Sequence, residues 1–201
     1  MTAETSPQAV HGPGALRAAT DEDVLASYVA GRDRDQAFSE LMDRYSRRVY
    51  AIGFRYFANH ADAQDATQDT FVAIARRAAT FSANSKLSTW VYRVAINACN
   101  DLARKRARRP SIPVADVPDV VDATASEHDD AVIAADTGAV VQRALLQLDE
   151  VSRTLLILVA IEGLTYVEAA GVADLPIGTV KSRVHRARAR LADLLADQLE
   201  T

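Results

Sequence analysis

Basic side chains gather in one short stretch near the C-terminus, "TVKSRVHRARARL", residues 179–191. This stretch holds five Lys and Arg residues and one His, whereas the 201-residue chain carries a formal net charge of −4. Lys and Arg side chains bind phosphate groups and the edges of guanine bases, so such a cluster predicts contact with nucleic acid. A solvated cationic helix end is the alternative interpretation, because positive charge also favours the C-terminal end of a helix dipole.

An acidic pattern lies earlier in the chain. Asp62, Asp65, Gln68 and Asp69 recur at steps of three and four residues, so they share one face of a predicted helix. Such a face suits a basic partner helix, because opposite charges steer docking and fix its register. Solvated acids near a helix N-terminus are the alternative. We expect no enzyme, because these carboxylates have no Gly-rich loop, metal cluster or convincing nucleophile beside them.

The remaining reactive side chains predict neither a metal site nor a cofactor. The single cysteine, Cys99, cannot form an internal disulfide, and its apolar helical stretch predicts a small buried hydrophobe, with a redox-active thiol as the alternative. The four His residues show no ligand spacing with one another or with Cys99. The N-terminus lacks the pattern of a secretory signal, and no apolar run approaches the ~20 residues that span a bilayer. We therefore expect a cytoplasmic protein without membrane insertion.

Helical periodicity runs through the whole chain and no alternating strand pattern occurs, so the expected fold class is all-α. The expected helices are 21–30, 35–57, 62–79, 88–107, 131–147, 150–162, 165–172 and 177–197. Local signals set their ends. We expect Gly31 and Gly163 as stops, a break between helices at Asn59 and Asp62, caps at Ser88 and Asp149, and a capping box from Thr165 to Glu168.

Composition divides the chain into two parts. Residues 111–137 hold seven acids and two prolines but no Lys or Arg, and they follow a basic run that ends before Pro110. This predicts two small helical domains, at 21–110 and 135–198, joined by a flexible acidic linker at 111–134. Residues 1–20 are poor in large apolar groups and are expected to form a disordered tail.

The last two expected helices form a recognisable unit. A short helix from Thr165 is stopped by Pro176, and a tight turn leads to the basic helix. The apolar residues of that helix recur at three- and four-residue steps and form one face: Val180, Val184, Ala187, Leu191 and Leu194. Two short helices joined by a tight turn, with a basic second helix, predict a helix-turn-helix that places its second helix in the major groove.

Two longer motifs resemble a known family. Residues 163–191, "GLTYVEAAGVADLPIGTVKSRVHRARARL", resemble the C-terminal promoter-binding domain of sigma factors. Residues 62–81, "DAQDATQDTFVAIARRAATF", followed by "STWVYRVAINACNDLARKRARR", resemble their other conserved domain. This order of motifs is that of the extracytoplasmic-function (ECF) group of the sigma-70 family, and the "GTVKSR" wording is similar to the actinobacterial sigma factor M subgroup. Asp174 stands where the family usually has a turn glycine, and Asp tolerates the left-handed conformation.

The resemblance implies an alternative sigma factor without catalysis, which directs promoter-specific initiation in a stress response. The implied partners are the β′ clamp helices and β subunit of core RNA polymerase, promoter DNA and an anti-sigma factor, with the chain itself a monomer. The acidic face at 62–69 would bind the clamp helices. In the family, the linker threads the polymerase cleft; a solvated spacer is the alternative here.

The resemblance also assigns DNA contacts. The loop at 81–90 would capture a base flipped from the minus-ten element, and such a base needs polar contacts and stacking. The implied minus-ten residues are Asn84, Ser85, Lys86, Trp90, Arg93, Asn97, Arg104, Lys105 and Arg108; for Trp90, core packing is an equal alternative. The implied minus-thirty-five residues are Thr179, Lys181, Ser182, Arg183, His185 and Arg186.

A stand-alone transcription regulator is the competing function. It would use the helix-turn-helix alone. The motifs of the first domain argue against it, because a repressor needs neither a polymerase-binding helix nor a base-capture loop.

Overall fold

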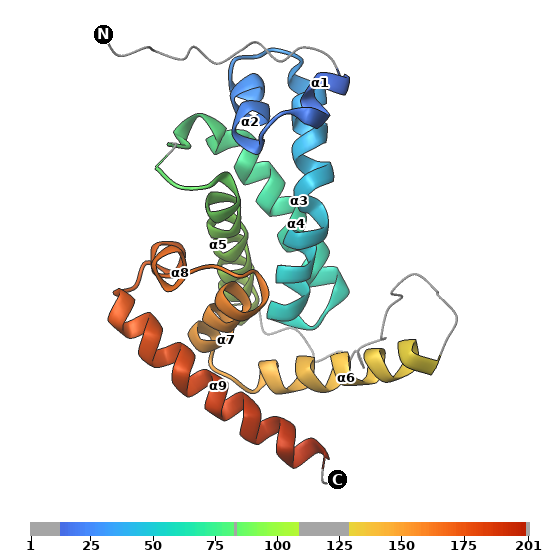
Figure 1. Ribbon diagram of the computed structural model, residues 1–201, viewed down its shortest axis with the longest axis vertical. Helices are drawn as coiled ribbons and strands as arrows, with labels where there is room; N and C mark the ends of the chain where they lie inside the picture. Colours follow the sequence, from blue (N-terminus) through green and yellow to red (C-terminus); the bar gives the residue numbers. More distant parts are fainter. Residues whose placement is uncertain (1–12, 83, 109–128, 200–201) are drawn as a thin grey trace.

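The computed structural model describes residues 13–82, 84–108 and 129–199 (Figure 1). Within these ranges every regular element is helical, which confirms the all-α expectation. In chain order they are α1 (Pro13–Ala18), α2 (Asp21–Val29), α3 (Arg34–Phe57), α4 (His60–Arg77), the 3₁₀ turn η1 (Ala78–Thr80), α5 (Leu87–Ala107), α6 (Asp129–Leu146), α7 (Glu150–Leu156), the π turn η2 (Ile157–Ile161), α8 (Tyr166–Ala173) and α9 (Ile177–Leu199). No helix in the described ranges is long and apolar enough to cross a membrane.

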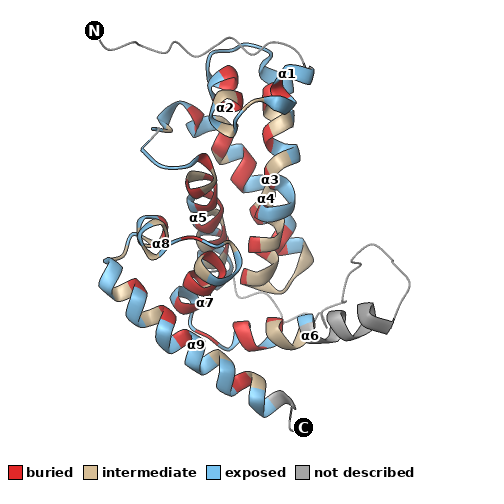
Figure 2. Ribbon diagram, in the orientation of Figure 1, coloured by how far each residue is buried: buried red, intermediate tan, exposed pale blue. Residues whose placement is uncertain are grey.

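Helix α5 lies at the centre of the molecule, with α3 and α4 along one side and α7 and α8 near the other (Figure 1). Its buried positions, which include Val91, Ala95, Ile96 and Cys99, cover most of its circumference (Figure 2). A helix that is buried on most of its sides belongs in a core. The first domain is therefore built around the helix that carries most of the predicted minus-ten residues.

Most predicted helix ends are confirmed, because they depend on local chemistry. The side chains of Asn59 and Asp149 accept hydrogen bonds from backbone amides at the starts of α4 and α7. Thr165 and Glu168 form the capping box of α8. Asp174 ends α8 in the left-handed conformation with φ 53°, as expected for its turn.

The start of α5 corrects one expectation. Ser88 was expected to cap this helix, but α5 already begins at Leu87, so Ser88 lies inside its first turn. Lys86 occupies the N-cap position and makes no side-chain capping bond. The acceptor for this helix start comes from another part of the chain.

The N-terminal segment corrects another. Residues 1–20 were expected to form a disordered tail, yet α1 is helical and the Leu16 side chain is only 1% exposed. Arg44 of α3 donates hydrogen bonds to the carbonyl oxygens of Leu16 and Ala19. The buried Leu16 side chain and the hydrogen bonds from Arg44 thus order a segment that composition alone predicts to be unstructured. Residues 1–12 lie outside the described residues.

The second predicted domain comprises α6 to α9. Helix α6 begins at Asp129, within the segment expected to be linker, and residues 109–128 of that linker lie outside the described residues. The helix expected at 150–162 changes from α7 into the π turn η2, where the Glu162 amide donates to the Ile157 carbonyl at 3.0 Å. Gly163 follows with φ 72°, which ends the helix as predicted.

The two predicted domains pack against each other. Their buried residues form one hydrophobic cluster, and α8 lies against α5 while α6 lies against α3. Gln142 of α6 donates to the carbonyl oxygens of Phe54 and Arg55, each at 3.1 Å. Arg153 of α7 donates to the Tyr56 carbonyl at 2.7 Å. The second domain therefore satisfies the Arg55 and Tyr56 carbonyl groups, which the end of α3 otherwise leaves unpaired. The Phe54 carbonyl also accepts from the Ala58 amide, so there Gln142 is a second donor.

Candidate nucleic-acid interface

Helix α9 presents its polar residues on a free face. Lys181, Ser182, His185 and Arg186 are exposed, whereas the apolar face that begins with Val180 is buried against α6, α7 and α8. Figure 2 shows this alternation along the helix, which lies at the edge of the molecule. A peripheral helix with free polar side chains at its N-terminal end has the geometry of a major-groove reader.

Two other predicted minus-thirty-five residues take part in internal contacts. Arg183 is half-buried and donates to the Asp149 carboxylate at 3.4 Å, so part of its charge is already paired. Thr179 is half-buried, and its carbonyl oxygen accepts a hydrogen bond from the Ser182 hydroxyl at 3.0 Å. Arg183, Arg186 and Arg190 line one pocket beside the α6–α7 turn, which gives this side of α9 a cationic lining.

The predicted base-capture loop, 81–90, is only partly a loop, because residues 87–90 form the first turn of α5. Asn84, Ser85 and Lys86 form an exposed polar turn between η1 and α5. The Lys86 ammonium group lies 3.7 Å from the Glu168 carboxylate of α8, which is a contact between the two predicted domains. An exposed ion pair of this kind contributes little to stability, so Lys86 can exchange this carboxylate for an acceptor on a DNA base at low cost.

Trp90 packs in the first domain. Its ring is half-buried and meets the Phe81 ring edge-on, with centroids 5.8 Å apart. Trp90 also lines the core pocket that contains Leu25, Tyr45 and Phe71. Of the two interpretations left open for this residue, the described contacts support core packing.

Arg93 and Asn97 lie one turn apart on the exposed side of α5. Helix α8 passes close to this side: a Cβ atom placed on Gly171 would lie 3.3 Å from Nη2 of Arg93. Gly171 is a poor helix former, costing about 1 kcal/mol relative to Ala, and here it gives the Arg93 side chain room. The first helix of the helix-turn-helix therefore lies beside the predicted minus-ten reader.

The basic residues at the end of α5 include both exposed side chains and one that pairs with a buried carboxylate. Arg104, Lys105 and Arg108 are exposed, and Arg104 pairs with Asp101 at 3.1 Å. Arg106 instead pairs with Asp62, whose side chain is 1% exposed. Sequence reasoning missed this pair, because the two residues lie on different helices. A separation of 44 positions leaves no periodic signal in the sequence.

The ion pair between Asp62 and Arg106 removes Asp62 from the predicted acidic face of α4. Asp65, Gln68 and Asp69 are exposed on one side of the helix, together with Val72, which is 47% exposed and which the sequence did not single out. Asp62 is buried instead. Burial raises the pKa of the Asp62 carboxyl above its ordinary value, although the Arg106 cation opposes this shift. Asp62 is thus separated from the surface that the other three residues form.

Cys99 is 1% exposed, and burial raises the pKa of its thiol to about 12. A thiol with so high a pKa carries almost no thiolate at neutral pH, so it is a poor nucleophile. This agrees with the packing interpretation of Cys99. Among the residues that the structure describes, no group of three or more His, Cys, Asp or Glu side chains has the arrangement of a metal site.

Two family models match the chain in the order that the motifs indicate. The model for Sigma-70 region 2 matches residues 41–109, and the model for Sigma-70 region 4 matches residues 139–191. Among curated proteins, the ECF RNA polymerase sigma factor SigM of Mycobacterium tuberculosis is 36% identical over 92% of this chain and 89% of its own length. The ECF RNA polymerase sigma factor SigW of Bacillus subtilis is 31% identical over 82% of this chain and 91% of its own length.

Solved structures show the same similarity. CnrH, solved in complex with the cytosolic domain of CnrY, is 27% identical with a TM-score of 0.64 and covers 88% of this chain and 97% of its own. The sigma factor RpoE of Bartonella quintana, solved with the anti-sigma factor NepR, is 26% identical with a TM-score of 0.63 and covers 79% of this chain and 96% of its own.

Proposed function

The chain belongs to the extracytoplasmic-function group of RNA polymerase sigma factors, and from this premise we propose that it is the subunit that gives core RNA polymerase specificity for a set of stress promoters. Sigma factors are regulatory proteins, and the proposal assigns this chain no catalytic step of its own. One observation carries it: a single chain holds two separate exposed groups of polar and basic residues, one on α9 and one on the loop and helix α5.

Helix α4 is the proposed polymerase-binding surface. Asp65, Gln68 and Asp69 offer two carboxylates and an amide beside the exposed apolar side chain of Val72. A charged rim next to an apolar contact suits a basic helix such as those of the β′ clamp, because charge steers the encounter and apolar area contributes affinity. Asp62 contributes indirectly, because its pair with Arg106 ties α4 to α5.

The two promoter elements are assigned to different helices. In the first unit, 21–110, Asn84, Ser85, Lys86 and Asn97 would contact bases of the minus-ten element, and Arg93 with the basic end of α5 would hold phosphates. In the second unit, 135–198, the exposed face of α9 would read the minus-thirty-five element in the major groove. Residues 111–134 would join the two units.

Control by an anti-sigma factor is part of the proposal. RpoE of Bartonella quintana was solved with the anti-sigma factor NepR, and this chain shares its fold over most of its length. A cytoplasmic location goes with these partners, since core polymerase and chromosomal DNA are found there.

Run-off transcription on a promoter library tests the proposal, using core polymerase with and without the protein. We expect start-site-specific transcripts only when the protein is present. If core polymerase gains no specificity while the protein alone shifts duplex DNA, the chain is a stand-alone regulator.

Charge reversal on α4 tests the polymerase surface in the same assay. Asp69→Lys is expected to abolish binding to core polymerase, because it places a cation against a basic partner. Asp43→Lys, the same change on the exposed surface of α3, is the matched control and should bind normally.

A further inference from the structure

The predicted promoter-reading helix α5 lacks a cap of its own. Lys86 at the N-cap position makes no side-chain hydrogen bond to the helix start, and the first turn contains no acidic residue. The first amides of a helix have no partners within it and need acceptors from elsewhere. The start of α5 also follows directly on the proposed base-capture loop, so any fraying there would displace Lys86 and Ser85.

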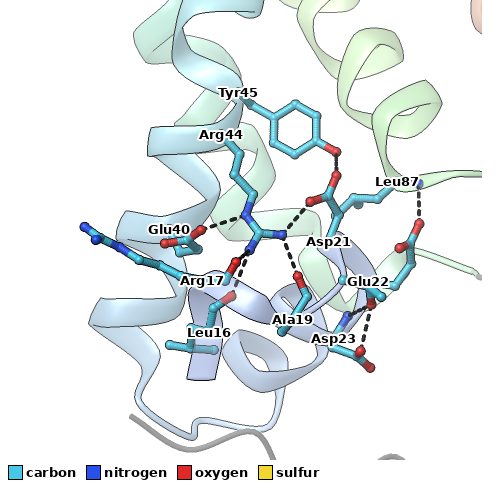
Figure 3. Close-up of polar contacts among 11 residues, drawn as sticks. Leu16, Arg17, Ala19, Asp21, Glu22, Asp23, Glu40, Arg44, Tyr45 and Leu87 are labelled. Carbon is cyan, nitrogen blue, oxygen red and sulfur yellow. Dashed lines mark hydrogen bonds and ion pairs between the residues drawn. The ribbon is translucent and has the colours of Figure 1, made fainter. Parts of the chain in front are cut away.

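Glu22 of α2 supplies the missing acceptor. The Leu87 amide donates to Oε1 of Glu22 at 3.0 Å (Figure 3). A carboxylate at this position also interacts favourably with the positive end of the α5 dipole. Helix α5 is therefore capped by a residue 65 positions earlier in the chain, and Glu22 lies upstream of the segment that matches Sigma-70 region 2.

A second cluster fixes α2, and with it Glu22. Arg44 of α3 donates to the Asp21 carboxylate at 2.6 Å, to the Leu16 carbonyl at 2.8 Å and to the Ala19 carbonyl at 3.0 Å (Figure 3). Tyr45, also of α3, donates its phenolic proton to Asp21. Burial and this hydrogen bond both raise the pKa of Tyr45, so its hydroxyl remains a donor. The N-terminal segment is thus held on α3 at the place where α5 begins.

We propose that Glu22 is a positioning residue for promoter recognition: it holds the first turn of α5, and so sets the orientation of the loop formed by Asn84, Ser85 and Lys86. This inference rests on the proposed function, since it assumes that the loop contacts DNA. The Arg44 cluster makes the N-terminal segment part of the same support. A loss of the Glu22 acceptor leaves the core of the first domain in place and loosens only the residues next to the loop.

Three variants test this in the full-length protein bound to core polymerase. Glu22→Ala removes the acceptor, Glu22→Gln keeps an oxygen that can accept from Leu87, and Asp23→Ala is the charge-matched control on the same helix. Asp23 accepts from the Thr20 hydroxyl at 2.7 Å and makes no hydrogen bond to α5. The readouts are affinity for core polymerase and affinity of the holoenzyme for a fluorescent single strand carrying the minus-ten sequence of a promoter selected by the unmodified protein.

We expect Glu22→Ala to weaken single-strand binding about fivefold, the effect of one hydrogen bond, with affinity for core polymerase unchanged. Glu22→Gln and Asp23→Ala should bind the single strand with an affinity within about twofold of that of the unmodified protein. Single-strand affinity unchanged in Glu22→Ala would overturn the proposal, and so would equal losses for the strand and for core polymerase.

Amide exchange measured by NMR on the free protein separates this inference from the proposed function. The Leu87 amide should exchange slowly in the unmodified protein and in Glu22→Gln, and about fivefold faster in Glu22→Ala, while Val91 one turn later stays unchanged. An unchanged rate at Leu87 would contradict the proposal even if the protein is a working sigma factor. If the Leu87 amide exchanges as expected but the holoenzyme shows no promoter preference, Glu22 caps α5 but has no role in promoter recognition.

Discussion

The two helices proposed to read DNA differ in their surroundings. Helix α5 lies in the middle of the molecule and is buried on most sides (Figure 2). Arg93 and Asn97 lie on the strip that remains exposed. Helix α9 lies at the edge, where one apolar face holds it and the opposite face is free. On α9, the residues proposed to contact DNA and the residues that stabilise the fold lie on different faces. On α5, these two sets of residues occupy adjacent positions. Substitutions on the exposed face of α9 should therefore change DNA binding alone, and substitutions on α5 should often change both.

The largest expected effect lies at the basic end of α5. Arg106→Ala would leave the buried Asp62 carboxylate without its cation, and we expect it to lower the free energy of unfolding by about 2–3 kcal/mol, somewhat less than for a fully buried pair because Arg106 is half-exposed. Lys105→Ala, its exposed neighbour, should change stability by less than about 0.5 kcal/mol. Urea unfolding of both variants measures the difference. Equal losses of unfolding free energy would mean that Arg106 contributes no more to stability than Lys105 does.

The pH dependence sharpens this test. Burial raises the pKa of Asp62, so the folded chain holds this proton more tightly than the unfolded chain does. The stability contribution of this group is therefore present at low pH and is lost as pH rises through the raised pKa. Arg106→Ala removes the opposing cation and raises that pKa further, so its destabilisation should be larger at pH 7 than at pH 4. A pH-independent difference would contradict the burial argument.

The second effect concerns the contact between the domains. The Arg153 guanidinium donates to the carbonyl oxygens of Leu145 and Leu146 at the end of α6 and of Leu148 in the turn that follows. It also donates to the Tyr56 carbonyl in α3. We expect Arg153→Ala to lower the free energy of unfolding by about 2 kcal/mol, since charged hydrogen bonds are lost and helix-end carbonyls are left unpaired.

Gln142→Ala is the matched comparison, because Gln142 bonds only to α3 carbonyls of the other domain. We expect a smaller loss, about 1 kcal/mol. If both variants unfold like the unmodified protein, the contact between the domains contributes nothing to stability.

The third effect falls on α9. Arg186→Ala is expected to weaken binding to minus-thirty-five duplex DNA by about tenfold, at the low end of the range for a base contact, without changing the free energy of unfolding. Arg143→Ala, an exposed residue of α6, gives the same change of charge away from the helix-turn-helix. Filter-binding titrations at one salt concentration compare them, and equal losses would mean that only net charge matters.

The smallest effect is a helix cap in the second domain. Asp149→Ala removes the acceptor for the Ser152 amide and should cost about 1 kcal/mol, whereas Asp149→Asn should retain most of the cap. Hydrogen bonds from Ser152 hold the pKa of Asp149 below its ordinary value. Its contribution is therefore present above the unfolded pKa of about 4 and is lost as pH falls through the folded value, which acid unfolding of the two variants would reveal.

Features that depend on a few neighbouring residues could be predicted from the sequence. The cap at Asp149, the capping box of α8 and the left-handed turn at Asp174 each need only a side chain and the backbone within four positions. Features that depend on partners far along the chain could not. The Asp62–Arg106 pair and the Glu22 cap of α5 join different helices, and no periodicity encodes them.

The same limit explains the site. The exposed face of α9 was predictable, because amphipathic spacing alone defines which residues face outward. The contact of α8 with α5 was not, because helix packing depends on side chains from both domains. For Trp90 the sequence left two interpretations open, and only its contacts with Phe81 and the core favour packing.

Promoter selection by variant holoenzymes would show whether α5 and α9 read two separate promoter elements. Core polymerase would be combined with the unmodified protein, with Arg186→Ala on α9 or with Asn97→Ala on α5, and transcripts from a randomised promoter library would be sequenced. We expect two separated promoter elements for the unmodified protein. Preference should be lost only in the upstream element for Arg186→Ala and only in the downstream element for Asn97→Ala. Variants that both alter the same element, or an unmodified protein that selects no downstream element, would contradict this expectation.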